Sequence, residues 1–242
     1  NRVRAAIRRF SLGRHRPLMN RIARRRWLQA LAAAGSLGPG GISGLIRNAL
    51  AEGNKPIAPG MHTISGNVTV NGQAAREGML VKSGDTIVTG PKSEAIYVIG
   101  QDAYMQRERS TVSFASDTAA GIMRVITGGI LSVFGKGAKK LEVPNATIGI
   151  RGTGCYIETQ GKSVYFCLCY GIAEVTPLAD PKQVERIETQ HHDHPILIHN
   201  DSAMPTMAPA TVVNHTDREL ILLENLVGRW PPFYGKPGAS GY

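Results

Sequence analysis

From residue 63 onward, short runs of β-branched and apolar residues alternate with glycine, asparagine and proline. Two such runs, 67–70 and 85–89, are separated by a segment containing Asn71-Gly72, a dipeptide that favours a tight β-hairpin. Strand-like runs recur at intervals of about 8–12 residues, which is typical of an all-β sandwich, barrel or solenoid. The other runs are 79–81, 94–99, 104–107, 111–114, 123–126, 130–134, 140–143, 154–159, 164–170 and 172–175. The pattern predicts a mainly β domain over residues 63–176.

The pattern changes after this domain. Residues 177–215 are rich in loop-forming residues and histidine, and we expect a loop segment there. One short α-helix is predicted over residues 216–228, because Thr216 and Glu219 have the spacing of a capping box and leucines follow at helical spacing. Gly228 stands where a helix C-terminal cap belongs. Residues 52–62 are expected to form a linker and residues 229–242 a tail.

The first 51 residues have a different composition from the rest. Residues 1–50 contain eleven arginines and no acidic residue, and they end in an Ala/Gly/Leu-rich run. A basic start, a weakly apolar stretch and the small-residue exit Ala49-Leu50-Ala51 are typical of an export signal. Paired arginines directly before Trp27-Leu28 resemble the twin-arginine type. The sequence therefore predicts a cleaved export signal over residues 1–51 and a periplasmic or secreted protein.

Charge and hydropathy weigh against two alternative roles for this segment. The chain has a net charge of +10, but residues 52–242 contain 17 basic and 18 acidic residues, a net charge of 17 − 18 = −1. A neutral domain attracts phosphate backbones weakly, so no nucleic-acid partner is expected. Residues 27–46 have about the 20-residue length of a membrane span, yet they include Gln29, Pro39 and five glycines. We expect no stable membrane span after cleavage, and an uncleaved anchor is the alternative.

Several blocks of the β region resemble the FecR domain when taken together. They are 66–72, 84–90, 128–133, 141–153, which contains Arg151-Gly152-Thr153, and 170–175. The resemblance covers residues 63–176 and implies an extracytoplasmic β-domain, sandwich- or solenoid-like, that binds other proteins. FecR-type regulators transmit a signal across the inner membrane to a sigma factor. No cytoplasmic regulatory domain is seen ahead of a convincing membrane helix, so we expect the fold to carry over more readily than the sigma-factor role.

All three cysteines of the chain fall in one predicted hairpin. Cys167 and Cys169 lie two residues apart in a strand, so their side chains point to the same face. Cys155 lies on the preceding strand, and a turn near 160–163 would bring it within reach of the pair. The three thiols are therefore predicted to converge on one patch of sheet. Burial as small apolar side chains, or a disulfide between Cys155 and one of the pair, is the alternative.

A histidine cluster follows about twenty residues later. His191, His192 and His194 are close in sequence, and five of the seven histidines fall between residues 191 and 215. Thiolates and imidazoles together suit zinc, copper or iron. Cys167 and Cys169 with two of these three histidines would give four ligands, the number of a tetrahedral centre, and Cys155 is a further candidate. Solvated histidines without a metal are the alternative.

Three functional hypotheses follow. The first is a non-enzymatic, exported FecR-like domain that binds protein partners in signalling or assembly. The second is a metal-binding subunit that uses the Cys-x-Cys strand and the histidine cluster. The third is an enzyme that uses a thiol or a bound metal, in which Asp193 would complete a Cys-His-Asp set. The sequence contains no G-x-S-x-G or H-E-x-x-H motif and no phosphate-binding glycine loop, so a non-enzymatic role is favoured.

Overall fold

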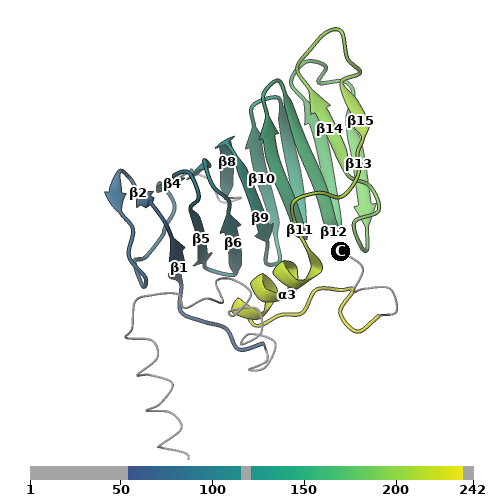
Figure 1. Ribbon diagram of the computed structural model, residues 1–242. Coiled ribbons are helices and arrows are strands. Elements are labelled where there is room, and N and C mark those ends of the chain that lie inside the picture. Colours follow the sequence, from purple (N-terminus) through teal and green to yellow (C-terminus); the bar gives the residue numbers. More distant parts are fainter. Residues whose placement is uncertain (1–53, 116–120, 237–242) are drawn as a thin grey trace, which may run out of the picture. The chain divides into compact units, whose positions relative to one another are not determined.

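The computed structural model describes residues 54–115 and 121–236, which belong to the compact unit from Ile42 to Tyr242. The predicted export signal lies outside the described residues. Within these residues, strands dominate and one helix follows them (Figure 1), which confirms the mainly β prediction. The elements are β1 (Gly60–Ser65), β2 (Val68–Val70), β3 (Gln73–Ala74), β4 (Thr86–Thr89), β5 (Glu94–Ile99), β6 (Asp102–Gln106), β7 (Thr111–Phe114), β8 (Ile122–Thr127), β9 (Gly129–Val133), β10 (Ala138–Val143), β11 (Ala146–Gln160), β12 (Ser163–Pro177), β13 (Glu185–Thr189), β14 (Ile196–His199), β15 (Met207–Pro209) and α3 (Asp217–Leu226).

Two long strands, β11 and β12, connect two layers of sheet. The first part of β11 pairs with β10, and its second part, from Gly154 to Glu158, pairs with β9. In β12, residues 163–166 pair with β14 and residues 171–175 pair with β13. One layer therefore contains β1, β5, β6, β9, β14 and β15, and the other contains β2, β3, β4, β7, β8, β10 and β13.

The β11–β12 hairpin changes layers at a glycine-containing bend. The pairing register shifts between Arg151 and Cys155, on both sides of Gly154. A Cβ at Gly154 would lie 2.6 Å from the ring of Tyr170, closer than atoms can approach. Gly171 has a φ of +102°, a conformation that residues with a side chain rarely adopt. Glycine at both positions permits the close backbone approach that the bend requires.

The main hydrophobic core lies between the two layers. Tyr104 of β6 packs on Phe114 of β7 with ring centroids 5.2 Å apart, and Tyr97 of β5 contacts Phe114 at 6.1 Å. A second cluster covers the other face of the layer formed by β5, β6, β9 and the start of β12. Since side chains alternate along a strand, this layer is apolar on both faces and needs a cover on its outer one. Helix α3 provides that cover.

Helix α3 packs against the outer face through Leu220, Leu223 and Leu226, next to β6 and β9 (Figure 1). Its start is fixed by the predicted capping box: the Thr216 hydroxyl accepts from the Glu219 amide, and the Glu219 carboxylate accepts from the Thr216 amide at 2.8 Å. The helix prediction is thus confirmed, and the helix begins one residue later and ends two residues earlier than predicted. Within the described residues, no helix combines the length and the apolar character needed to cross a membrane.

Some local predictions were wrong. Residues 177–215, expected as loop, contain β13, β14 and β15, and β1 begins at Gly60 inside the expected linker. Residues 79–81, expected as a strand, are not one. In β13 only Ile187 and Thr189 are buried, so this edge strand has too few apolar positions for alternation to reveal it. The Asn71-Gly72 hairpin is confirmed, because Val70 pairs with Gln73 across a turn with positive φ at both central residues.

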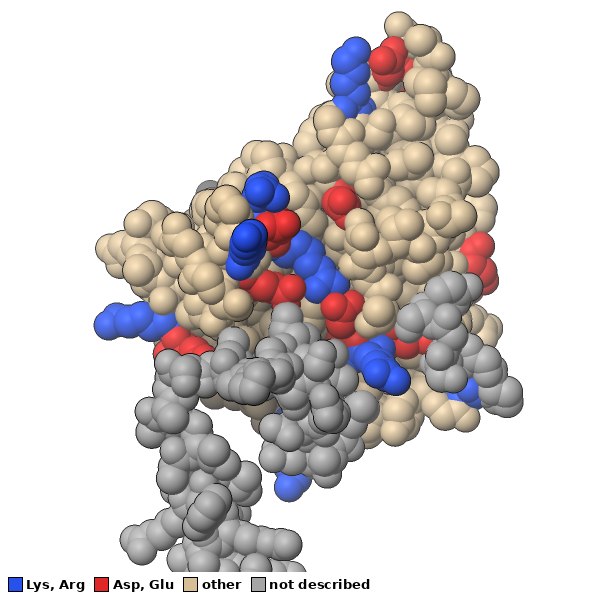
Figure 2. All heavy atoms as spheres, viewed as in Figure 1, with Lys and Arg blue, Asp and Glu red and all other residues tan. Residues whose placement is uncertain are grey.

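Charged side chains are interspersed on the face shown in Figure 2, where acidic groups lie next to basic ones. Ion pairs among the described residues include Arg124 with Glu142 and Lys162 with Asp201, whose side chains are at least partly exposed. Such pairs contribute little to stability because solvent screens them. This face therefore carries mixed charge rather than a field of one sign.

Candidate metal centre

Four buried side chains with metal-ligating atoms converge on the outer face of the sheet, next to the start of α3. They are Cys167 and Cys169 of β12, His192 in the loop after β13, and His215 directly before the helix. One donor atom from each lies within 4.8 Å of all the others. Two thiols and two imidazoles make a Cys₂His₂ set, a ligand combination common in structural zinc sites.

Local structure explains how three separate segments meet here. Cys167 and Cys169 share a face because they are two residues apart in a strand. Thr216 is the N-cap of the helix, so His215 directly precedes α3. When the leucines of α3 pack on the sheet, His215 is placed next to the sheet as well. The amide of His192 donates to the carbonyl of Cys169 at 3.1 Å, which ties the histidine loop to β12.

The donor distances are close to those of a tetrahedral centre. His192 Nδ1 lies 3.5 Å from Cys167 Sγ and 3.1 Å from His215 Nε2. With zinc bonds of about 2.3 Å to sulfur and about 2.05 Å to nitrogen, a tetrahedron places nitrogen and sulfur about 3.6 Å apart and two nitrogens about 3.3 Å apart. These two distances match the tetrahedral values, and the other donor atoms of the four side chains lie within 4.8 Å of one another.

Hydrogen bonds on the far side of each imidazole fix which nitrogen faces the others. His215 Nδ1 donates to the carbonyl of Val213 at 2.7 Å, and His192 Nε2 donates to Asp217 Oδ1 at 3.1 Å. A neutral imidazole that donates from one nitrogen carries a lone pair on the other. His192 Nδ1 and His215 Nε2 are therefore the nitrogens that face each other, at 3.1 Å, and with both rings neutral each would offer its lone pair to a cation between them.

Asp217, the first residue of α3, is the main neighbour of the four-ligand cluster. Its buried carboxylate contacts His192 and also lies 2.9 Å, through both oxygens, from His191 Nε2. On the other side, the ring of Tyr156 stacks on His215 with centroids 4.9 Å apart and planes 18° from parallel. A carboxylate behind a ligating histidine orients the ring and raises its basicity.

The two thiols of the cluster differ in acidity. A hydrogen bond from Cys169, together with those from His192 and His215, holds the pKa of the Cys167 thiol well below its usual range despite burial. Burial raises the pKa of Cys169, and the neighbouring Cys167 raises it further. One thiolate is thus favoured by the protein alone, whereas a second would need a cation, such as a metal ion, to offset the repulsion.

Cys155 lies on the opposite face of the sheet from the other two cysteines. It pairs with Leu168 in the hairpin register, and it belongs to the core between the layers. Burial raises the pKa of its thiol. All three cysteines are free and buried. The predicted convergence of three thiols was therefore wrong for Cys155, because the two-residue turn at 161–162 sets a register that turns it away.

The predicted histidines take different positions. His192 joins the cysteines, whereas His191 contacts Asp217 beside the cluster. His194 is half exposed and lies 2.9 Å from Glu185 Oε1, away from the four-ligand set. Asp193, considered for a Cys-His-Asp set, instead accepts a hydrogen bond from the Thr189 hydroxyl.

His215 and Asp217 were missing from the predicted site residues. Both flank Thr216, the N-cap of the one well-predicted helix. An amphipathic helix buries its apolar face against a neighbouring element. Polar residues at its first turn are therefore brought close to that element too. Their position beside a helix start was the one signal in the sequence that could have identified them.

Part of the chain aligns with solved structures of another protein. The chain matches no family model, and no curated protein matches it. Two crystal structures of a "putative anti-sigma factor" from Parabacteroides distasonis, at 1.65 and 2.50 Å resolution, align with a TM-score of 0.43 and 10% sequence identity. The alignment covers 52% of this chain and 59% of that one.

Proposed function

We propose that this chain is a metal-binding β-domain in which Cys167, Cys169, His192 and His215 bind one zinc ion. The observation that carries the proposal is the convergence of these four donor atoms within 4.8 Å of one another, with two of the donor distances close to those of a tetrahedral site. Two thiolates favour zinc, copper or iron over magnesium or calcium, and a four-ligand Cys₂His₂ set is typical of zinc.

The ion would have a structural role. All four ligand residues are buried, and four protein ligands complete a tetrahedral shell, so no position is left open for a substrate. The ligands come from β12, the loop after β13 and the segment before α3. One ion would therefore fasten the helix and the histidine loop to the sheet.

The test is metal content of the full chain, purified and then titrated with zinc or cobalt(II). We expect one ion per chain, with the visible absorption of tetrahedral cobalt–thiolate coordination for the cobalt form. Cys167→Ser and His215→Ala should lose this binding. The matched controls are Cys155→Ser, an equally buried cysteine on the other face, and His194→Ala, a neighbouring histidine outside the cluster. These two should bind one ion as before.

Two results would contradict the proposal. One is a wild-type chain that binds no transition metal, and the other is equal loss of binding in Cys155→Ser and Cys167→Ser.

We further propose that the domain is exported and binds a protein partner, as a FecR-like module. The mainly β fold supports this proposal, as do the arginine-rich residues 1–51 and the near-neutral charge of residues 52–242. Residues 1–51 fused to a reporter should direct it out of the cytoplasm, and Arg25→Lys with Arg26→Lys should reduce that export. Unchanged localisation in the variant would contradict the twin-arginine interpretation.

A further inference from the structure

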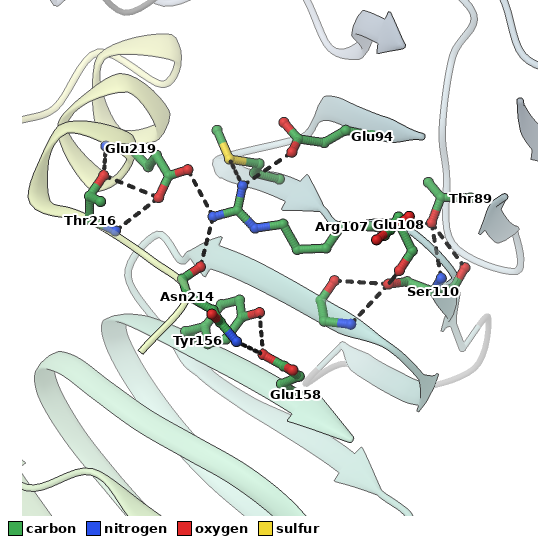
Figure 3. Close-up of polar contacts among 12 residues, drawn as sticks. Thr89, Glu94, Arg107, Glu108, Ser110, Tyr156, Glu158, Asn214, Thr216 and Glu219 are labelled. Carbon is green, nitrogen blue, oxygen red and sulfur yellow. Dashed lines mark hydrogen bonds and ion pairs between the residues drawn. The ribbon is translucent and has the colours of Figure 1, made fainter. Parts of the chain in front are cut away.

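Arg107, directly after β6, connects the sheet to the segment that carries His215. Its Nη1 lies 3.1 Å from Glu94 Oε2 of β5, and its Nη2 lies 2.8 Å from Glu219 Oε1 of α3. Nη2 also donates to the carbonyl of Asn214 at 3.0 Å. Figure 3 shows the guanidinium between the two carboxylates, with the Asn214 carbonyl on its helix side. The contacts to Asn214 and Glu219 flank His215 in the chain.

A second set of contacts holds the same segment from the other side. The Asn214 side chain donates to Glu158 Oε2 at 2.7 Å, and the Tyr156 hydroxyl donates to the same oxygen at 2.7 Å (Figure 3). Tyr156 in turn stacks on the His215 ring. Asn214 has a φ of +59°, which asparagine tolerates better than most residues. Both the backbone and the ring of His215 are thus positioned by neighbours outside the four-ligand cluster.

Arginine suits this position for reasons of shape and charge. Its planar fork reaches two carboxylates and a carbonyl at once, whereas a lysine presents a single point charge. The side chains of Arg107 and Glu94 are each 20% exposed, and that of Glu219 is 14% exposed. Without the guanidinium, these two carboxylates would face each other in a poorly solvated place. The capping box of α3 also depends on Glu219, so Arg107 acts on the helix start.

We propose that Arg107 is a positioning residue of the metal centre, which holds Asn214 and Glu219 so that His215 Nε2 points at the ion. This inference rests on the proposed metal-binding function. Under this proposal, metal affinity depends on Arg107, although its guanidinium contacts Glu94, Glu219 and Asn214 rather than the four ligand residues. Removal of partners behind a metal ligand typically weakens metal affinity by about 10–100-fold.

The test compares cobalt(II) and zinc affinity of the full chain in three forms: wild type, Arg107→Met and Arg124→Met. Arg124 is the matched control, because it is also an arginine paired with a glutamate, but it belongs to the other layer. We expect about a tenfold or larger loss of affinity for Arg107→Met, with a changed cobalt absorption spectrum. Arg124→Met should bind as wild type does. A purely structural role would lower stability equally with and without metal and leave the affinity unchanged.

A second variant covers the case in which Arg107→Met does not fold. Glu219→Gln keeps the capping box, since glutamine serves in that position, but it places an amide in front of Arg107 instead of a carboxylate. We expect a several-fold loss of affinity with the helix retained. Wild-type affinity in Glu219→Gln, or in a folded Arg107→Met, would overturn the inference. A wild-type chain that binds no metal would instead overturn the proposed function, so the two failures are distinguishable.

Discussion

The sharpest single test of the metal centre is Asp217→Asn. Asp217 is buried at the first position of α3, and it accepts from His192 at 3.1 Å and from His191 at 2.9 Å. Asparagine has almost the same shape, so the substitution removes the negative charge and one acceptor oxygen while the packing stays. Asp217 contacts Nε2 of His192, whereas the other ring nitrogen, Nδ1, would face the ion.

The expected magnitude follows from the change in hydrogen bonding. A hydrogen bond to a charged group contributes about 1.5–3 kcal/mol, and a neutral one about 0.5–1.5 kcal/mol. Replacing one by the other at His192 weakens this bond by about 1–1.5 kcal/mol, and because metal binding needs His192 held in this orientation, we expect up to about a tenfold loss of zinc affinity. The charge at the helix N-terminus adds about 0.3–1 kcal/mol, but this affects the free energy of unfolding with and without metal alike.

The assay is a competition titration of zinc against a chromophoric chelator, with urea unfolding of the metal-free forms measured separately. Glu185→Gln is the matched control, because Glu185 also lies 2.9 Å from a histidine, but that histidine is His194. The control should leave zinc affinity within about twofold of wild type, since the pair is outside the cluster. Wild-type affinity in Asp217→Asn would refute the view that this carboxylate orients a ligating histidine.

Two further predictions concern stability. Leu223→Ala removes a fully buried side chain of α3 and should lower the free energy of unfolding, measured in urea, by about 2–5 kcal/mol. The control is Leu178→Ala, at an exposed position, which should change this free energy by less than about 0.5 kcal/mol. Equal effects of the two substitutions would contradict the packing of α3 on the sheet. Gly154→Ala should cost about 1–3 kcal/mol because its Cβ would meet the Tyr170 ring at 2.6 Å. Gly149→Ala, in the same strand with its nearest atom at 4.0 Å, should be neutral or slightly stabilising, and a loss as large as that of Gly154→Ala would refute the steric argument.

The sequence predicted what depends on local patterns. The capping box at Thr216 determined the start of α3, and alternation along a strand placed Cys167 and Cys169 on one face. The position of Cys155 depended on the hairpin register, which changes face with a shift of one residue and cannot be derived from composition. His215 joins the cluster through packing of α3 on β6 and β9, a long-range contact whose partner strands the local pattern does not specify.

Helix α3 spans ten residues, shorter than the about 12–15 residues that an isolated helix needs for even marginal stability in water. Its C-terminal half is attached by other means: Glu224 accepts from Tyr170 and from Arg229 at 2.5 Å, and the Ile57 amide donates to the Leu226 carbonyl. The N-terminal half depends on the capping box, on Arg107 and on the segment that contains His215. The core between the two layers contains none of the four proposed ligands. If the proposed ion binds, we expect its removal to loosen the start of α3 and the histidine loop while the sheet stays folded, so the ion would stabilise the position of the helix locally.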